Sequence, residues 1–329
     1  MRHVINGYQV TTDFTTVGGG QCQWALAERD TVPLFIKRFL APRYPVEGSP
    51  GSPATKTLKL ERCRAFELHH RSLIGALQHR CAVGGNLVVA RDFFRDGTSF
   101  YKVTDRVDIA RLTPDHIAAL PPEQQLLLLK TVTHSLSILH EARLVHCDLR
   151  PDNVLVKRTA AGIYITKLID LDSCYFSEAP PPADQVAADP IYLSPEMSRY
   201  TAGTAVDPRL LTVKADIFSL GLLFAMFTVG SNAFSAFPSY GTQYAHEFVL
   251  AGYSVPLPWD RIPRRFAPLI RRMVSLSPEE RPTAREILNA LKADAPPERP
   301  SVSRLRGALV SPASAPVATR LRGTLIGSR

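Results

Sequence analysis

Cysteine is scarce in this chain, and its spacing argues against two kinds of structural site. The 329 residues include five cysteines, an odd number with no C-x-x-C pair. This pattern fits neither a disulfide framework nor a zinc site, so we expect reduced thiols in a cytoplasmic protein. Long apolar runs are also missing, because the longest, residues 217–229, is too short to span a bilayer. The N-terminus lacks the apolar core of a signal peptide, and we expect neither secretion nor a membrane span.

Acidic residues are in deficit, and the deficit is concentrated at the C-terminus. Lys and Arg number 39 against 30 Asp and Glu, which gives a net charge of +9. Residues 295–329 hold six arginines and one glutamate, so this tail carries +5 and the rest of the chain +4. A mildly basic body does not favour specific binding of nucleic acid. The alternative is a tail that binds nucleic acid or an anionic membrane, with an association that falls steeply as salt rises.

The basic tail contains an internal repeat. S-R-L-R-G-A-L-V-S at 303–311 recurs as T-R-L-R-G-T-L-I-G at 319–327. Pro, Ala, Ser and Arg are abundant around it, which predicts a disordered segment. We interpret the repeated R-L-R-G motif as a docking segment for a partner.

Hydrophobic patterning divides the body into a β-rich part and a helical part. The first hundred residues predict one helix at 58–77, after a loop at 41–57 rich in Pro, Gly and Ser, and strands at 35–40, 87–94 and 99–107. From residue 114 the pattern predicts strands at 154–157 and 164–169 and helices at 122–143, 215–229, 266–275 and 284–293. We therefore predict an α+β fold, with a ligand between a small β-rich lobe and a larger helical lobe.

One stretch carries a specific chemical pattern. Residues 146–153 read H-C-D-L-R-P-D-N, directly after a predicted helix and directly before a predicted strand. They match the protein-kinase catalytic loop H-R-D-L-x-x-x-N, except that Cys147 replaces the arginine. Taken alone, this match would also suit small-molecule phosphotransferases with kinase-like folds.

Six further motifs occur in the order found in protein kinases. They are V-G-G-G-Q-C-Q-W at 17–24, L-F-I-K at 34–37, K-L-I-D-L-D at 167–172, I-Y-L-S-P-E at 191–196, K-A-D-I-F-S-L-G at 214–221 and S-P-E-E-R-P-T at 277–283. Small-molecule phosphotransferases lack the last three. Over residues 14–293 the chain therefore resembles the eukaryotic-like serine/threonine protein kinases of bacteria. The resemblance implies a bilobal protein-kinase-like fold, with an N-terminal extension or first strand at 1–13, an N-lobe and hinge at 14–107, a C-lobe at 108–294 and a tail at 295–329.

The resemblance also implies ATP and Mg²⁺ as cofactors. Lys37 would position the α and β phosphates and be held by a carboxylate on the helix, for which Glu67 is our choice and Glu61 the competitor. The glycine-rich loop would cover the phosphates, Thr104 would be the gatekeeper, and residues 105–107 would be the hinge beside adenine. The implied nucleotide-binding residues are Gly18, Gly19, Gly20, Lys37, Glu67, Thr104, Asp105 and Val107.

The implied catalytic residues lie in and after the catalytic loop. Asp148 would accept the proton of a substrate hydroxyl, and Arg150 would offer a cation to the γ-phosphate. Asn153 and Asp170 would hold Mg²⁺, a hard cation that takes oxygen ligands. The D-L-R-P-D-N form favours serine or threonine of a protein substrate as acceptor, and Thr324 and nearby serines of the tail are candidate acceptors too.

Two supporting contacts are also implied, one at the catalytic loop and one at the end of the activation segment. Asp216 would brace the loop, and Arg281 would form a buried ion pair with Glu196.

Several positions depart from the family pattern. Cys147 removes the arginine that pairs with a phosphorylated activation loop, and Asp189 stands where threonine is usual. We hypothesise that Asp189 pairs with Arg150. Asp172 replaces the glycine of D-F-G, and Phe35 replaces the small alanine that lies over adenine. Phe35 and Asp172, together with Gln23 in the third glycine position, favour the alternative of a pseudokinase scaffold that binds nucleotide weakly or not at all.

Overall fold

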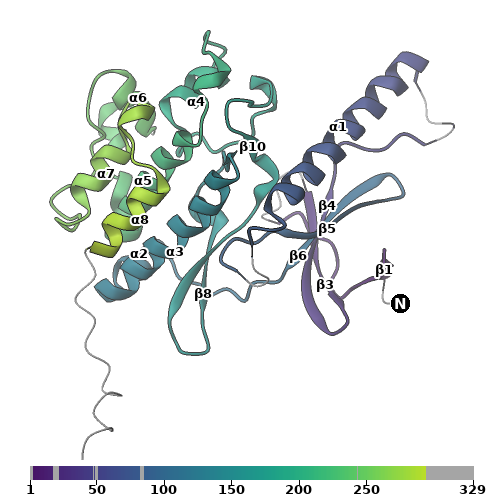
Figure 1. The fold of residues 1–329 in the computed structure, drawn as a ribbon, viewed down its shortest axis with the longest axis horizontal. Helices are drawn as coiled ribbons and strands as arrows, with labels where there is room; N and C mark the ends of the chain where they lie inside the picture. Colours follow the sequence, from purple (N-terminus) through teal and green to yellow (C-terminus); the bar gives the residue numbers. More distant parts are fainter. Residues whose placement is uncertain are drawn as a thin grey trace, which may run out of the picture. The chain divides into compact units, whose positions relative to one another are not determined.

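The N-terminal part of the protein is one antiparallel sheet of six strands, in the order β1-β2-β3-β4-β6-β5 (Figure 1). The computed structural model describes residues 3–17, 22–46, 48, 51–81, 85–242 and 244–293. The strands are β1 (His3–Ile5), β2 (Tyr8–Val10), β3 (Cys22–Arg29), β4 (Val32–Phe39), β5 (Ala90–Asp96) and β6 (Ser99–Asp105). Because β1 and β2 join this sheet, residues 3–10 belong to the small lobe itself.

Helix α1 (Pro53–Leu77) begins five residues earlier than the sequence pattern predicts. The Ser52 side chain accepts a hydrogen bond from the backbone N–H of Thr55, and Pro53 occupies the first helical position. Both features favour a helix start, so the end of the Pro/Gly/Ser-rich segment is helical rather than loop. The buried residues of α1 begin only at Cys63, and the first turns of the helix are exposed and extend past the sheet (Figure 1).

The C-terminal part is mostly helical and carries two small two-stranded sheets. Its helices are α2 (Pro114–Ala118), α3 (Pro122–Glu141), α4 (Pro195–Thr201), α5 (Lys214–Val229), α6 (Ala245–Leu250), α7 (Ala267–Met273) and α8 (Ala284–Ala293). Its strands are β7 (Leu144–Val145), β8 (Val154–Arg158), β9 (Tyr164–Leu168) and β10 (Tyr175–Phe176), with β8 paired to β9 and β7 to β10. This is the predicted order of a β-rich lobe followed by a helical lobe.

Helix α5 is the centre of the helical part. Of its 16 residues, 14 are buried, and a helix that is apolar on all sides belongs inside a core. It also passes close to α7, because a Cβ added at Gly221 would lie 2.9 Å from Met273 Cβ and from Val274 Cγ1. The first turn of this fixed helix carries Asp216, next to the catalytic loop.

Three expectations from the sequence concern the cysteines, a membrane span and the tail. All five cysteines are free, as expected for reduced thiols. Among the described helices, none combines the length and apolarity needed to cross a membrane. The repeated tail motif lies outside the described residues, beyond the compact unit Met1–Asp294.

Candidate active site

The catalytic loop lies between β7 and β8 and is held by a buried carboxylate. Asp216, 1% exposed, accepts hydrogen bonds from the backbone N–H groups of His146 (2.8 Å) and Cys147 (3.0 Å). The His140 ring nitrogen lies 3.0 Å from the same carboxylate. Cys147 has a positive φ of 70°, a conformation that costs energy for a residue with a side chain and needs such support. The expected brace from Asp216 is therefore confirmed.

Asp148 and Asn153 face each other across the loop. Asn153 Nδ2 donates to Asp148 Oδ2 at 2.9 Å and to the Asp148 carbonyl oxygen at 2.8 Å. The backbone N–H of Asp189 donates to the other carboxylate oxygen, Oδ1, at 3.3 Å. Both oxygens of Asp148 are thus oriented, as a residue that accepts a proton from a substrate hydroxyl requires.

The hypothesised pair between Arg150 and Asp189 is confirmed. Arg150 Nη1 lies 2.9 Å from Asp189 Oδ2, and Asp189 Oδ1 accepts a hydrogen bond from the backbone of Ile191 at 3.0 Å. Arg150 also forms an ion pair with Asp152. Burial raises the pKa of the Cys147 thiol, and nearby Asp216 raises it further, so Cys147 stays a neutral thiol. A thiol carries no positive charge in either protonation state and does not replace the missing arginine.

Asp170 follows β9 at a turn that brings it to the catalytic loop. The backbone N–H of Ile169 donates to the carbonyl oxygen of Asn153 at 2.9 Å, and the His146 ring lies 3.1 Å from the Ile169 carbonyl oxygen. Asp170 itself has a φ of 58°, which turns the chain sharply after the strand. The two expected magnesium-binding residues, Asn153 and Asp170, are therefore on segments bonded to each other.

The oxygen groups on these segments suit a hard divalent cation. Asp170 offers a carboxylate that is 36% exposed, and no described residue donates a hydrogen bond to Oδ1 of Asn153. Carboxylate and amide oxygens are the ligands that Mg²⁺ prefers in proteins. The donor set thus fits the expected metal.

Lys37 projects from β4 to the segment that follows β9. Its Nζ lies 3.0 and 3.1 Å from the two carboxylate oxygens of Asp170 and 2.6 Å from Asp172 Oδ2. Burial alone would lower the pKa of Lys37, but Asp172 and Asp170 raise it above its ordinary value. Burial would likewise raise the pKa of Asp172, but Lys102 and Lys37 hold it well below its usual range. Lys37 and Asp172 are therefore both charged at neutral pH.

The expected pairing of Lys37 with Glu67 is wrong. Glu67 Oε1 accepts instead from Arg71, at 3.0 Å from Nε and 2.8 Å from Nη2, one turn further along α1. Glu61 is exposed and does not take its place. The reason is the rotation of the helix, whose inward positions are filled by Phe66 and His70 against the aromatic side chains of the sheet.

Sequence reasoning missed two residues of the site, Lys102 and His70. Lys102 on β6 forms an ion pair with Asp172 and lies 3.5 Å from Asp170. His70 Nδ1 lies 3.9 Å from Asp172 Oδ1, and burial among aromatic rings lowers the pKa of His70 to about 3, so it is neutral. A lysine within the buried run F-Y-K-V of a strand was the available signal for the first.

Two aromatic rings lie on the Lys37 face of the sheet. Phe35 and Lys37 share a face because they are two residues apart on β4, and Trp24 of β3 is directly opposite Lys37. The Trp24 and Phe35 rings stack, with centroids 5.4 Å apart. Phe35 is paired with Thr104, the expected gatekeeper. A base entering beside Thr104 therefore meets an aromatic surface rather than a small alanine.

The other residues expected at the nucleotide site lie in three parts of the chain. Asp105 ends β6 and pairs with Arg91, and Val107 lies in the connection from β6 to α2. Gly18, Gly19 and Gly20 lie outside the described residues. Whether these residues contact nucleotide remains a prediction.

The buried pair expected at the end of the activation segment is confirmed. Arg281 Nη1 and Nη2 donate to the two carboxylate oxygens of Glu196 at 2.7 and 2.8 Å. The guanidinium also donates to the backbone carbonyls of Ser275, Leu276 and Lys214. The pair joins the start of α4 to the segment before α8.

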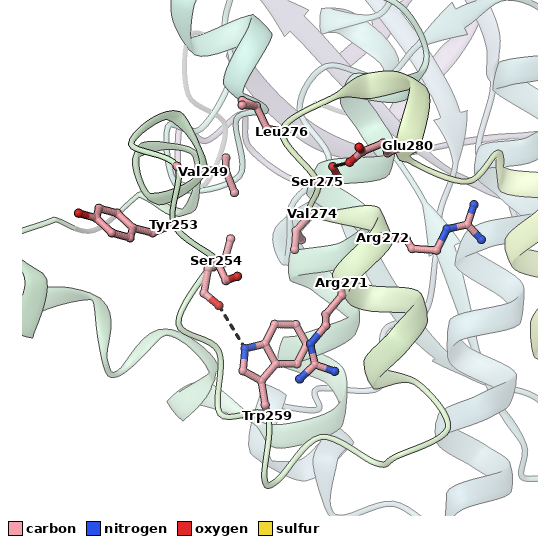
Figure 2. A pocket seen from close by; sticks show the side chains of 12 residues that line it. Val249, Tyr253, Ser254, Trp259, Arg271, Arg272, Val274, Ser275, Leu276 and Glu280 are labelled. Atoms are coloured by element: carbon pink, nitrogen blue, oxygen red, sulfur yellow. Dashed lines mark hydrogen bonds between the residues drawn. The ribbon is translucent and has the colours of Figure 1, made fainter.

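A cavity of about 770 Å³ lies elsewhere in the helical part (Figure 2). Its wall includes Trp259, whose ring lies 4.2 Å from the Arg271 guanidinium carbon and whose Nε1 donates to the Val255 carbonyl oxygen at 3.3 Å. None of the expected site residues lines this cavity.

Comparisons with known proteins point to one family. Residues 53–291 match the family model of the protein kinase domain, which covers α1 onward but not the strand with Lys37. The chain is 26% identical over 232 residues to the ovarian-specific serine/threonine-protein kinase Lok of Drosophila melanogaster, covering 68% of this chain and 45% of that protein. It is 28% identical over 244 residues to the serine/threonine-protein kinase pkn2 of Myxococcus xanthus, covering 67% and 26%.

A third relative is the serine/threonine-protein kinase PkaA of Streptomyces coelicolor, 25% identical over 258 residues, which cover 75% of this chain and 44% of the relative. The chain thus spans less than half the length of these three relatives. Protein kinases generally use ATP and Mg²⁺ and act on proteins. The family model covers most of the described body, and the chain belongs to the protein kinase family.

Proposed function

We propose that this chain is a serine/threonine protein kinase that transfers the γ-phosphoryl group of ATP, with Mg²⁺, to a protein hydroxyl. The observation that carries the proposal is the meeting of Lys37 with Asp170, on a segment bonded to the Asp148–Asn153 pair. These four residues come from β4, the catalytic loop and the turn after β9. A scaffold without catalytic activity has no chemical reason to keep all four residues.

Phosphoryl transfer depends mainly on positioning and on neutralising charge. The hydroxyl oxygen of serine or threonine bonds to the γ-phosphorus, the bond from that phosphorus to the bridging oxygen breaks, and ADP leaves. Asp148 takes the proton of the hydroxyl. Mg²⁺, held by Asn153 and Asp170, would neutralise phosphate charge when bound. Lys37 orients the phosphates, and Arg150 offers a cation to the γ-phosphate.

The direct test measures transfer of label from [γ-³²P]ATP in the presence of Mg²⁺ to general acceptor proteins, followed by phosphoamino-acid analysis. We expect phosphoserine or phosphothreonine from the wild type and a loss of about 10²–10⁴-fold in Asp148→Asn. Equal labelling by the wild type and the variant would contradict the proposal. Lack of any transfer by well-folded wild type would favour the pseudokinase alternative.

We propose that the protein is cytoplasmic, which its five free cysteines support. We also propose that the repeated R-L-R-G motif of the tail docks on a partner or presents acceptor hydroxyls, including Thr324. Mapping of phosphorylated residues after incubation with ATP tests the acceptor form. Sites confined to residues before 295 would exclude it.

A further inference from the structure

Four charged side chains from two strands and one turn form a cluster at the proposed phosphate site. Lys37 on β4 and Lys102 on β6 are directly opposite each other in the sheet. They face Asp170 and Asp172, and the side chains of the two lysines are 13% and 9% exposed. Two ammonium groups thus neutralise two carboxylates in a place where an unpaired charge would be costly.

Within this cluster, Asp172 is the closer partner of Lys37. Asp172 Oδ2 lies 2.6 Å from Lys37 Nζ, whereas the oxygens of Asp170 lie at 3.0 and 3.1 Å. Asp172 is in the short 3₁₀ turn Leu171–Ser173, directly after Asp170. The turn therefore supplies two carboxylates, one exposed enough to meet a cation and one, 18% exposed, that faces the lysines.

Helix α1 supplies no carboxylate to Lys37. Its nearest contribution is the neutral His70, which stacks on Phe93 with ring centroids 4.5 Å apart. Glu67 is bonded to Arg71. The position of Lys37 therefore depends on the turn after β9 rather than on an ion pair with the helix.

Lys102 contacts the oxygen of Asp172 that Lys37 does not use. It pairs with Oδ1, while Lys37 pairs with Oδ2. With both oxygens occupied, the Asp172 carboxylate cannot rotate without breaking one charged contact. When the phosphates of a nucleotide pair with the Lys37 ammonium, Lys102 still neutralises the Asp172 carboxylate.

We propose that Asp172 positions Lys37 for the nucleotide phosphates and that Lys102 holds Asp172 in place. Both are positioning residues, because they act through Lys37. The use made of Lys37 rests on the proposed kinase function, but its position can be measured without any catalysis.

The experiment measures acylation of the Lys37 amine in nucleotide-free protein, with the modified peptide quantified by mass spectrometry. A paired, buried ammonium reacts slowly, so we expect Asp172→Asn to speed labelling about tenfold or more. Lys102→Met should speed it in the same direction, and Lys102→Arg should preserve the protection. The matched control is Glu67→Gln, which removes the carboxylate on α1 and should leave the labelling rate at the wild-type value.

A double variant tests whether Lys102 acts through Asp172. If it does, Lys102→Met adds nothing to the labelling rate once Asp172→Asn is present. An additive effect would contradict that role, and unchanged labelling in Asp172→Asn alone would overturn the whole inference. Denaturant midpoints of all variants exclude global opening as the cause. Should Asp172→Asn not fold, Lys102→Met against Lys102→Arg decides, and equal labelling of these two would overturn the proposal.

The outcome is separable from that of the proposed function. A chain that shows this labelling pattern but transfers no phosphate would contradict the kinase proposal and leave the positioning of Lys37 intact. If the wild type transfers phosphate but Lys37 is labelled equally in the wild type and in Asp172→Asn, the inference about Lys37 is overturned and the kinase proposal is kept.

Discussion

The guanidinium of Arg150 and the carboxylate of Asp189 are joined by an ion pair of 2.9 Å between Nη1 and Oδ2. Arg150 belongs to the catalytic loop and Asp189 to the segment before α4, so the pair ties the two together. The Asp189 backbone also contacts Asp148. In some segments of this kind, phosphorylation of a residue adds a negative charge. Here the carboxylate of Asp189 supplies a negative charge without modification. We therefore expect activation without phosphorylation of this segment.

The first prediction concerns this pair. Replacing Asp189 by Asn or by Thr removes the charge and should lower turnover by about tenfold, which corresponds to roughly 1.4 kcal/mol in the barrier. Initial rates of phosphoryl transfer measure the effect. Phosphatase treatment of the wild type should leave its rate unchanged. Full turnover in both variants would remove the proposed role of the pair.

The second prediction concerns the buried pair of Glu196 and Arg281. Arg281→Met leaves Glu196 unpaired in the interior, which should destabilise the fold by about 3–5 kcal/mol. Arg285→Ala is the matched control, because Arg285 pairs with Glu141 at 3.0 Å on the surface. Its loss should lower the free energy of unfolding by less than about 1 kcal/mol. Urea unfolding measures both. Similar losses in the two variants would contradict the account of Arg281.

The third prediction uses two glycines in helices. Gly221→Ala places a Cβ against Met273 and Val274 and should destabilise the protein by about 1–3 kcal/mol. Gly75 on α1 has open space around it, so Gly75→Ala should stabilise by about 0.4–1 kcal/mol. Thermal unfolding compares the two. A stabilising change in Gly221→Ala would contradict the described packing of α5 against α7.

The fourth prediction concerns the aromatic surface of the sheet. Trp24 stacks on Phe35 beside the expected gatekeeper, so a bound base should change the emission of Trp24. Trp259→Phe removes the other tryptophan, which lies in the helical part. We expect addition of Mg²⁺ and ATP to quench the remaining emission. Binding detected by calorimetry without any change in emission would place the base elsewhere.

The sequence predicted well those features that depend on contiguous residues. The catalytic loop, the strand of Lys37 and the segment of Asp170 are each read from a local motif, and family order places them together. The pair of Arg150 and Asp189 could also be predicted, because an aspartate stands where threonine is usual and the catalytic loop offers a cation as its partner.

The family resemblance supplied two long-range contacts, the Arg281–Glu196 pair and the brace from Asp216, but features that are specific to how the elements of this chain rotate or pack were not predicted. Glu67 and His70 differ by three residues on one helix, and only the packing of Phe66 and His70 against the sheet decides which side chain faces Asp172. Lys102 meets Asp172 across 70 residues of sequence, in a contact that no local pattern specifies. The early start of α1 depends on one cap, Ser52, inside a segment whose composition is typical of a loop.

The most direct measurement is a crystal structure with Mg²⁺ and a non-hydrolysable ATP analogue. We predict that Lys37 Nζ keeps its contact with Asp172 and exchanges Asp170 for phosphate oxygens, while Asp170 and Asn153 contact the metal beside Asp148. A complex in which Lys37 still binds Asp170 and the analogue is held away from these residues would contradict the account.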